Sequence, residues 1–115
     1  EHHMKPLDIE SVLKVIVRKL VSGYRPEKII LFGSYAHGNP RSGSDIDLLI
    51  IKNTRKRGRE RRIDVRKILD TPLEFPTVDP IVMTSREMRE RLEITDDFIG
   101  IILAKGRVIY DRAAS

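Results

Sequence analysis

Two aspartates lie two residues apart in the otherwise apolar run from Asp45 to Ile51. Successive side chains of a strand point to opposite faces, so Asp45 and Asp47 would share one face, with their Cα atoms ~6.6 Å apart. Two carboxylates in an apolar strand repel each other and lose hydration unless a cation neutralises them. The pattern therefore predicts a metal site. The alternative is that Asp45 caps the start of the strand and that Asp47 is solvated.

The ligand types available in the chain favour a hard cation. There is no cysteine and no pair of histidines at ligand spacing, and carboxylate oxygens suit Mg²⁺ or Mn²⁺ better than zinc. The lack of cysteine also excludes disulfides and thiol nucleophiles. This composition fits a reducing compartment, so we expect the cytoplasm.

A glycine and a serine, Gly33-Ser34, follow the first predicted strand. A residue without Cβ lets backbone N–H groups approach a phosphate, and the helix expected to begin here would favour the phosphate charge. Ser34 can donate one more hydrogen bond. The P-loop and dinucleotide-binding glycine motifs are absent, which disfavours both of those folds. A hydrolytic triad of Ser34, His37 and an aspartate is disfavoured because the G-x-S-x-G elbow is missing.

The elements that must position these residues alternate between helix and strand. Apolar residues recur at intervals of three and four from Asp8 to about Ser22, which predicts an amphipathic helix with Asp8 as its N-cap and Gly23 as its end. The run 45–51 is apolar on both faces, so we expect it in the middle of a sheet that is covered on both sides. The other predicted strands are 28–32, 77–83 and 108–110, and the other predicted helices are 56–69, one at the start of the tail, and 96–105.

The chain length of 115 residues supports one domain with one modest core. We interpret residues 1–3 as the remnant of an expression tag and residues 4–115 as the single domain. The longest apolar run, Phe98 to Ala104, is far shorter than the ~20 residues of a membrane-spanning helix, so no membrane is expected.

Positive charge is concentrated in one segment. Residues 52–67 contain nine basic and two acidic side chains, a net charge of +7, whereas the whole chain has a net charge of +5. Three interpretations stay open: a solvated helix face, a nucleic-acid surface, and a surface that docks an acidic partner. The few aromatic residues disfavour base stacking.

The motifs LFGS at residues 31–34 and DIDL at residues 45–48 are separated by ten residues. In this spacing they resemble the signature of the DNA polymerase beta-like nucleotidyltransferase superfamily. The stretch LFGSYAHGNPRSGSDIDLLI resembles in particular the minimal nucleotidyltransferases, small proteins usually encoded beside a HEPN-domain partner, and the likeness continues through residues 78–79 to GRVIYDR. The resemblance implies an α/β (α+β) fold in which a small mixed sheet packs with helices.

The resemblance also implies roles for single residues. Gly33 and Ser34 would hold the outer phosphates of the nucleotide, while Asp45 and Asp47 would coordinate two Mg²⁺ ions. The third family carboxylate, on the next strand, maps to Asp79, which would complete the metal site or take the proton from the attacking hydroxyl. The rival position for this third carboxylate is Asp64, in the predicted helix.

The chain departs from the family pattern at a few positions. Many relatives have arginine where this chain has Tyr35 and His37, so Arg41 is the candidate for the missing contact with the nucleotide. Pro80 directly follows Asp79, where it could displace that carboxylate. Pro80 also removes one backbone donor, which favours a sheet edge for the strand 77–83.

The resemblance implies that the chain transfers AMP from ATP, or a monophosphate from another nucleoside triphosphate, onto an acceptor hydroxyl. In a chain of this length we expect no further domain to hold the acceptor, so a partner would supply it. The implied acceptor is a tyrosine of a HEPN-family toxin, with this chain as the antitoxin. The alternatives are a non-catalytic antitoxin that acts by contact, and a transferase for a small molecule or an RNA end. The association of several copies of the chain stays open.

Overall fold

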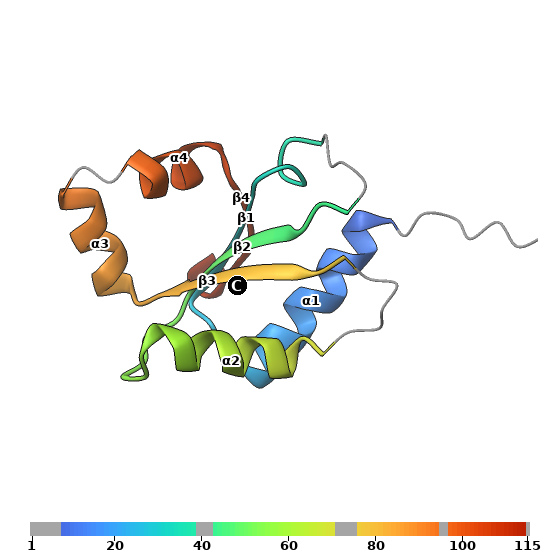
Figure 1. Ribbon diagram of the computed structural model, residues 1–115, viewed down its shortest axis with the longest axis horizontal. Helices are drawn as coiled ribbons and strands as arrows, with labels where there is room; N and C mark the ends of the chain where they lie inside the picture. Colours follow the sequence, from blue (N-terminus) through green and yellow to red (C-terminus); the bar gives the residue numbers. More distant parts are fainter. Residues whose placement is uncertain (1–7, 39–42, 71–75, 95–96, 115) are drawn as a thin grey trace, which may run out of the picture.

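The computed structural model describes residues 8–38, 43–70, 76–94 and 97–114. A mixed sheet of four strands separates two pairs of helices (Figure 1). No helix within the described ranges is long and apolar enough to cross a membrane. In chain order the elements are α1 (Ile9–Gly23), β1 (Lys28–Phe32), β2 (Ile46–Ile51), α2 (Gly58–Ile68), β3 (Val78–Met83), α3 (Ser85–Glu93), α4 (Asp97–Lys105), β4 (Arg107–Asp111) and a 3₁₀ turn, η1 (Arg112–Ala114).

The strand order is β3-β2-β1-β4. β1 is antiparallel to both β2 and β4, whereas β2 and β3 run parallel. The helices and strands predicted from periodicity are confirmed, with ends that differ by one or two residues. As predicted, β2 is an inner strand with helices on both sides of it (Figure 1).

The helix α1 begins and ends where its sequence predicts. The Asp8 carboxylate accepts a hydrogen bond from the Glu10 amide at 3.1 Å, which satisfies one of the free donors of the first turn. Gly23 is the last helical residue. The apolar stripe of α1 lies in the core, and its buried members are Val12, Leu13, Ile16 and Leu20.

The two faces of β2 contribute to two separate cores. One core contains the apolar faces of α1 and α2 together with the even-numbered residues of β2. The other contains Leu49 and Ile51 with residues of α4. Because side chains alternate along a strand, Asp45 and Asp47 lie on the same side of the sheet as Leu49. The carboxylates therefore belong to the side covered by α3 and α4.

The strand β3 lies at an edge of the sheet, as Pro80 predicts. The carbonyls of Thr77 and Met83 accept hydrogen bonds of 2.8 Å from the amides at the two ends of β2. Pro80 therefore has its nitrogen on the open side, where no donor is needed. The Val82 carbonyl, on the same open side, accepts from Arg61 Nη1 at 3.3 Å. A proline and an occupied carbonyl hinder another strand from pairing with this edge.

The apolar residues of the segment 56–69, Ile63, Val65, Ile68 and Leu69, predict a narrow buried stripe on α2. The prediction is wrong for Ile63, because 43% of this residue is exposed. Arg61 is buried instead, and it donates to the Lys56 carbonyl at 2.6 Å and to both Glu87 carboxylate oxygens at 2.6 and 3.3 Å. The hydrogen bond from Arg61 lowers the pKa of Glu87, which also closes a capping box with Thr84 at the start of α3. The ion pair thus joins α2 to α3 at the end of β3.

Candidate active site

Asp47 and Asp79 lie opposite each other on neighbouring strands. In the parallel pair of β2 and β3, Asp47 is in register with Asp79, and residues in register point to the same face of a sheet. Adjacent strands are ~4.8 Å apart, so the two carboxylates can reach one cation. Asp79 is exposed at the sheet edge, while Asp47 is half-buried.

Asp45 immediately precedes β2 and is exposed. Burial raises the pKa of Asp47, and the negative charges of Asp79 and Asp45 raise it further. The structure therefore brings these three aspartates into one electrostatic cluster. Pro80 does not move Asp79 out of the ladder, since Pro80 keeps its own register with Leu48.

Gly33 lies directly against Asp47. Its φ of 75° is in the left-handed region, which glycine adopts without steric cost. The residue before it, Phe32, is the β1 residue in register with Asp47. A Cβ at residue 33 would overlap the Asp47 Oδ2 atom and would lie 3.1 Å from Asp47 Cγ. The position predicted to receive a phosphate therefore adjoins the position predicted to bind a metal.

The segment after Gly33 is a pair of turns, so the prediction of a helix here is wrong. The Ala36 amide donates to the Gly33 carbonyl at 3.1 Å, and the His37 amide donates to the Ser34 carbonyl at 3.3 Å. Both bonds span three residues and close turns. Gly38, with a φ of 75°, then leaves the helical conformation. A phosphate at Gly33 would be held by turn amides and the Ser34 hydroxyl, without a helix dipole.

Tyr35 and His37 stand where many relatives have arginine, and neither provides an obvious contact with the nucleotide in place of that arginine. Tyr35 packs against the core on the side of α1 and α2, away from the carboxylates. His37 is exposed on the second turn. Arg41, the predicted replacement, lies outside the described residues, and its role stays a prediction.

Asp64, the rival third carboxylate, is not beside Asp47. It lies on α2, and its carboxylate accepts a hydrogen bond from Lys56 Nζ at 2.7 Å. The helix α2 packs on the opposite side of the sheet from the face that carries Asp47. Of the two candidates, Asp79 is the residue that the fold places next to Asp47.

The aspartate cluster fits a hard divalent cation. Within the described ranges, no lysine or arginine forms an ion pair with Asp45, Asp47 or Asp79, so the negative charge is uncompensated. In the same ranges, no three His, Cys, Asp or Glu side chains form a ready-made metal site. Oxygen donors of this kind suit Mg²⁺ or Mn²⁺.

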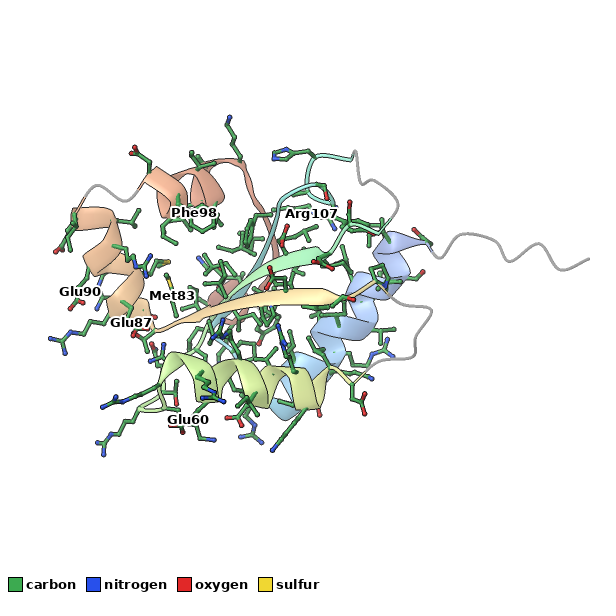
Figure 2. All side chains as sticks on the ribbon, in the orientation of Figure 1. Glu60, Met83, Glu87, Glu90, Phe98 and Arg107 are labelled. Carbon is green, nitrogen blue, oxygen red and sulfur yellow. The ribbon has the colours of Figure 1, made fainter. Side chains whose placement is uncertain are left out.

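An aromatic pair borders the cluster, and sequence reasoning missed it. Phe98 extends from α4 toward the sheet (Figure 2) and meets Phe32 edge-on, with ring centroids 6.0 Å apart. Phe32 is the neighbour of Asp47 across the β1–β2 ladder, and half of Phe98 is exposed. The sequence feature that could have indicated an aromatic residue here is Phe32, at the end of the strand directly before Gly33. Its contact with Phe98 depends on how α4 packs against the sheet.

A family model described as "Nucleotidyltransferase domain" matches residues 11–109 of the chain. The fold is similar to that of a crystal structure titled as a "putative nucleotidyltransferase" from Sulfolobus solfataricus, with a TM-score of 0.61 and 23% sequence identity. This likeness covers 90% of the present chain and 80% of the other. At this identity it concerns the fold alone.

Two curated proteins of Methanocaldococcus jannaschii are also similar. "Putative protein adenylyltransferase MJ1305" is 43% identical over 91 residues, which cover 73% of this chain and 58% of that protein. "Putative protein adenylyltransferase MJ0604" is 34% identical over 107 residues, which cover 88% of this chain and 97% of that protein. The chain thus spans little more than half of the first relative and nearly all of the second.

Proposed function

Because the chain belongs to the nucleotidyltransferase domain family, we propose that it transfers AMP from ATP to a hydroxyl of a partner protein in a Mg²⁺-dependent reaction. The observation that best supports this is the register of Asp47 with Asp79, beside Asp45 and against Gly33. Nucleotidyltransferases of this family generally use divalent metal ions. The proposal assigns the ion to the three aspartates.

In the proposed reaction each carboxylate has a position that suits its role. Asp45 and Asp47 would hold Mg²⁺, with Asp79 completing the site. Bound Mg²⁺ stabilises the charge that develops on the α-phosphate and on the departing pyrophosphate. Asp79, exposed at the sheet edge, would accept the proton of the attacking hydroxyl. The acceptor oxygen then bonds to the α-phosphorus as the bond to pyrophosphate breaks.

The turns after Gly33 would bind the outer phosphates. The amides of Ala36 and His37 are used within the turns. No hydrogen bond within the described part of the chain uses the amides of Ser34 and Tyr35. These two amides and the Ser34 hydroxyl would therefore be the donors for the triphosphate, next to the metal site.

A protein acceptor is supported by the names of the two relatives and by the surface beside the aspartates. Phe98 and Ile101, one helical turn apart on α4, are 50% and 55% exposed, on the same side of the sheet as Asp47. Exposed apolar side chains of this size are typical of protein interfaces. We propose that the partner is a HEPN-family toxin, that its tyrosine is the acceptor, and that the reaction takes place in the cytoplasm.

The test is transfer of labelled AMP to a co-purified HEPN-domain partner. With α-³²P-ATP and Mg²⁺, the partner should become labelled and gain the mass of one AMP on a tyrosine. The Asp47→Asn variant should give no label. An unmodified but inhibited partner would instead support a non-catalytic binding module, and label on RNA or on a small molecule would refute the protein acceptor.

A further inference from the structure

The helix α2 and the loop before it carry a group of basic side chains that the transfer reaction does not use. Nine basic residues lie between positions 52 and 67, and three of them have structural partners: Lys52, Lys56 and Arg61. The remaining six are exposed, and none forms an ion pair within the described ranges. We call them the α2 basic surface: Arg55, Arg57, Arg59, Arg62, Arg66 and Lys67.

The charges of the α2 basic surface repel one another. Arg59, Arg62 and Arg66 follow one another at spacings of three and four residues, so they are neighbours on the helix surface. Like charges at these spacings destabilise a helix. Polar helices are often merely solvated, but such a helix is usually stabilised by pairs of opposite charge. Here the repulsion would be relieved by an external polyanion.

Hollows on both sides of α2 extend this surface. One, of about 670 Å³, lies along the edge strand β3 and is bordered by Arg59, Arg62 and Arg91, and also by Glu87 and Glu90. The other, of about 540 Å³, is bordered by Lys52, Lys56 and Lys67, and also by Asp64. Basic side chains thus outnumber carboxylates in the lining of both hollows.

The chemistry of the α2 basic surface favours a nucleic acid over an acidic protein. Protein interfaces need an apolar centre with aromatic anchors, and in α2 the one exposed large hydrophobic residue is Ile63. Interfaces with nucleic acids are instead polar and strongly positive. Arginine, which dominates this surface, matches the geometry of phosphate. We propose that the α2 basic surface binds the phosphate backbone of a nucleic acid.

The proposed surface is separate from the aspartate cluster. α2 lies on the opposite side of the sheet from α3 and α4 (Figure 1). Asp47 and Asp79 share the face of Leu49, on the side of α3 and α4. A nucleic acid on α2 would not contact the carboxylates, which would repel it. Binding of a nucleic acid to α2 is therefore independent of AMP transfer, and either activity can exist without the other.

Fluorescence anisotropy with labelled oligonucleotides tests the proposal. The probes are a duplex DNA and a single-stranded RNA of equal length, titrated with the full chain at several KCl concentrations. For duplex DNA, log K falls with log [KCl] by about 0.9 for each phosphate neutralised, so about four contacts would give a slope near −3.6. The corresponding factor for a single strand is about 0.7. Comparison of the two probes identifies the preferred form of nucleic acid.

A triple variant and a matched control distinguish the effect of this surface on binding from the effect of the net charge of the chain. Arg59→Gln, Arg62→Gln and Arg66→Gln together should weaken binding at least tenfold at 100 mM KCl and reduce the magnitude of the duplex slope by about 2.7. The control, with the same change in net charge, combines three exposed positions on α3 and α4: Arg86→Gln, Arg89→Gln and Lys105→Gln. It should bind like the wild type.

Three outcomes would overturn the proposal. One is that the wild type fails to bind either probe at 100 mM KCl. Another is that the control variant loses as much affinity as the triple variant. The third is that polyglutamate binds as tightly as the oligonucleotides, which would point to an acidic protein. If the triple variant unfolds, Arg59→Gln and Arg66→Gln are measured singly, and each should reduce the duplex slope by about 0.9.

Discussion

The Asp47 carboxylate is half-buried between two other carboxylates, so its charged form is disfavoured in the folded chain. Its pKa is raised by burial first and then by Asp79 and Asp45. A carboxyl with a raised pKa keeps its proton in the folded state at a pH where the unfolded chain has lost it. The stability that this group contributes therefore decreases as the pH rises above 3.8, the ordinary pKa of an aspartate. Such a cost is typical of a residue that is retained for function.

The Asp47→Asn substitution is expected to abolish AMP transfer and to raise the melting temperature of the metal-free protein at pH 7. The reason is that the amide removes an uncompensated charge. The gain should shrink as the pH falls through the raised pKa of Asp47 and should be lost below pH 3.8, where the carboxyl is protonated in the folded and unfolded chain alike. Thermal unfolding in EDTA from pH 3.5 to pH 8 measures it.

Mg²⁺ gives the matching test of the metal site. At a concentration ten times its Kd, an ion that binds only the folded chain stabilises it by about 1.4 kcal/mol. The wild type should therefore melt at a higher temperature in Mg²⁺, and the Asp47→Asn variant should not. An equal shift in both proteins would mean that Asp47 does not hold the ion.

Gly33→Ala is expected to destabilise the chain and to abolish transfer. Its φ of 75° costs an L-residue about 1–2 kcal/mol, and the new methyl group would push the Asp47 carboxylate away. Gly38→Ala is the control, because Gly38 has the same φ but a Cβ there would meet no atom within 4 Å. It should lose similar stability and keep transfer activity. Equal activity in the two variants would exclude a role for the contact between Gly33 and Asp47.

At the scale of elements, one buried arginine joins α2, β3 and α3. Arg61 is 8% exposed in its side chain, whereas its partner Glu87 is 44% exposed. The guanidinium also occupies the Val82 carbonyl on the open edge of β3. The ion pair thus both positions α3 and protects the open edge of β3, the strand that carries Asp79 near its start.

Arg61→Met should lower the free energy of unfolding by about 2–3 kcal/mol, because it leaves buried carbonyls without a donor. The exposed pair of Arg86 and Glu90 on α3 is the control, and Arg86→Ala should cost less than about 1 kcal/mol. Urea unfolding measures both. A loss in Arg61→Met as small as in the control would show that the buried ion pair does not stabilise the junction.

At the scale of the whole molecule, the sheet separates two surfaces of different character. The side of α3 and α4 carries the aspartates and exposed apolar residues, among them Phe98 and Ile101. The side of α2 carries the unpaired basic residues. A protein acceptor and a nucleic acid could therefore bind at the same time without overlap.

Substitutions of two isoleucines on opposite sides of the sheet test whether the two surfaces have separate roles. Ile101→Gln, at a residue 55% exposed on α4, should reduce AMP transfer to the protein acceptor while ATP binding and the melting temperature stay unchanged. Ile63→Gln, at a residue 43% exposed on α2, should leave transfer unchanged. Transfer rates at varied acceptor concentration and ATP affinity by fluorescence measure the effects. Reduced transfer in both variants would argue against docking on α4.

Local periodicity by itself determined the face shared by Asp45 and Asp47, the helix α1 and the edge position that Pro80 requires, because these depend on residues a few positions apart. The resemblance already mapped the third carboxylate to Asp79 rather than Asp64, but only the tertiary structure placed Asp79 in register with Asp47, since the pairing of β2 with β3 joins segments about thirty residues apart. It also placed Ile63 outside and Arg61 inside, because the buried face of a short polar helix is chosen by its neighbours. The turns after Gly33, in place of the predicted helix, likewise depend on the tertiary structure, because the chain must reverse there to form β2 antiparallel to β1.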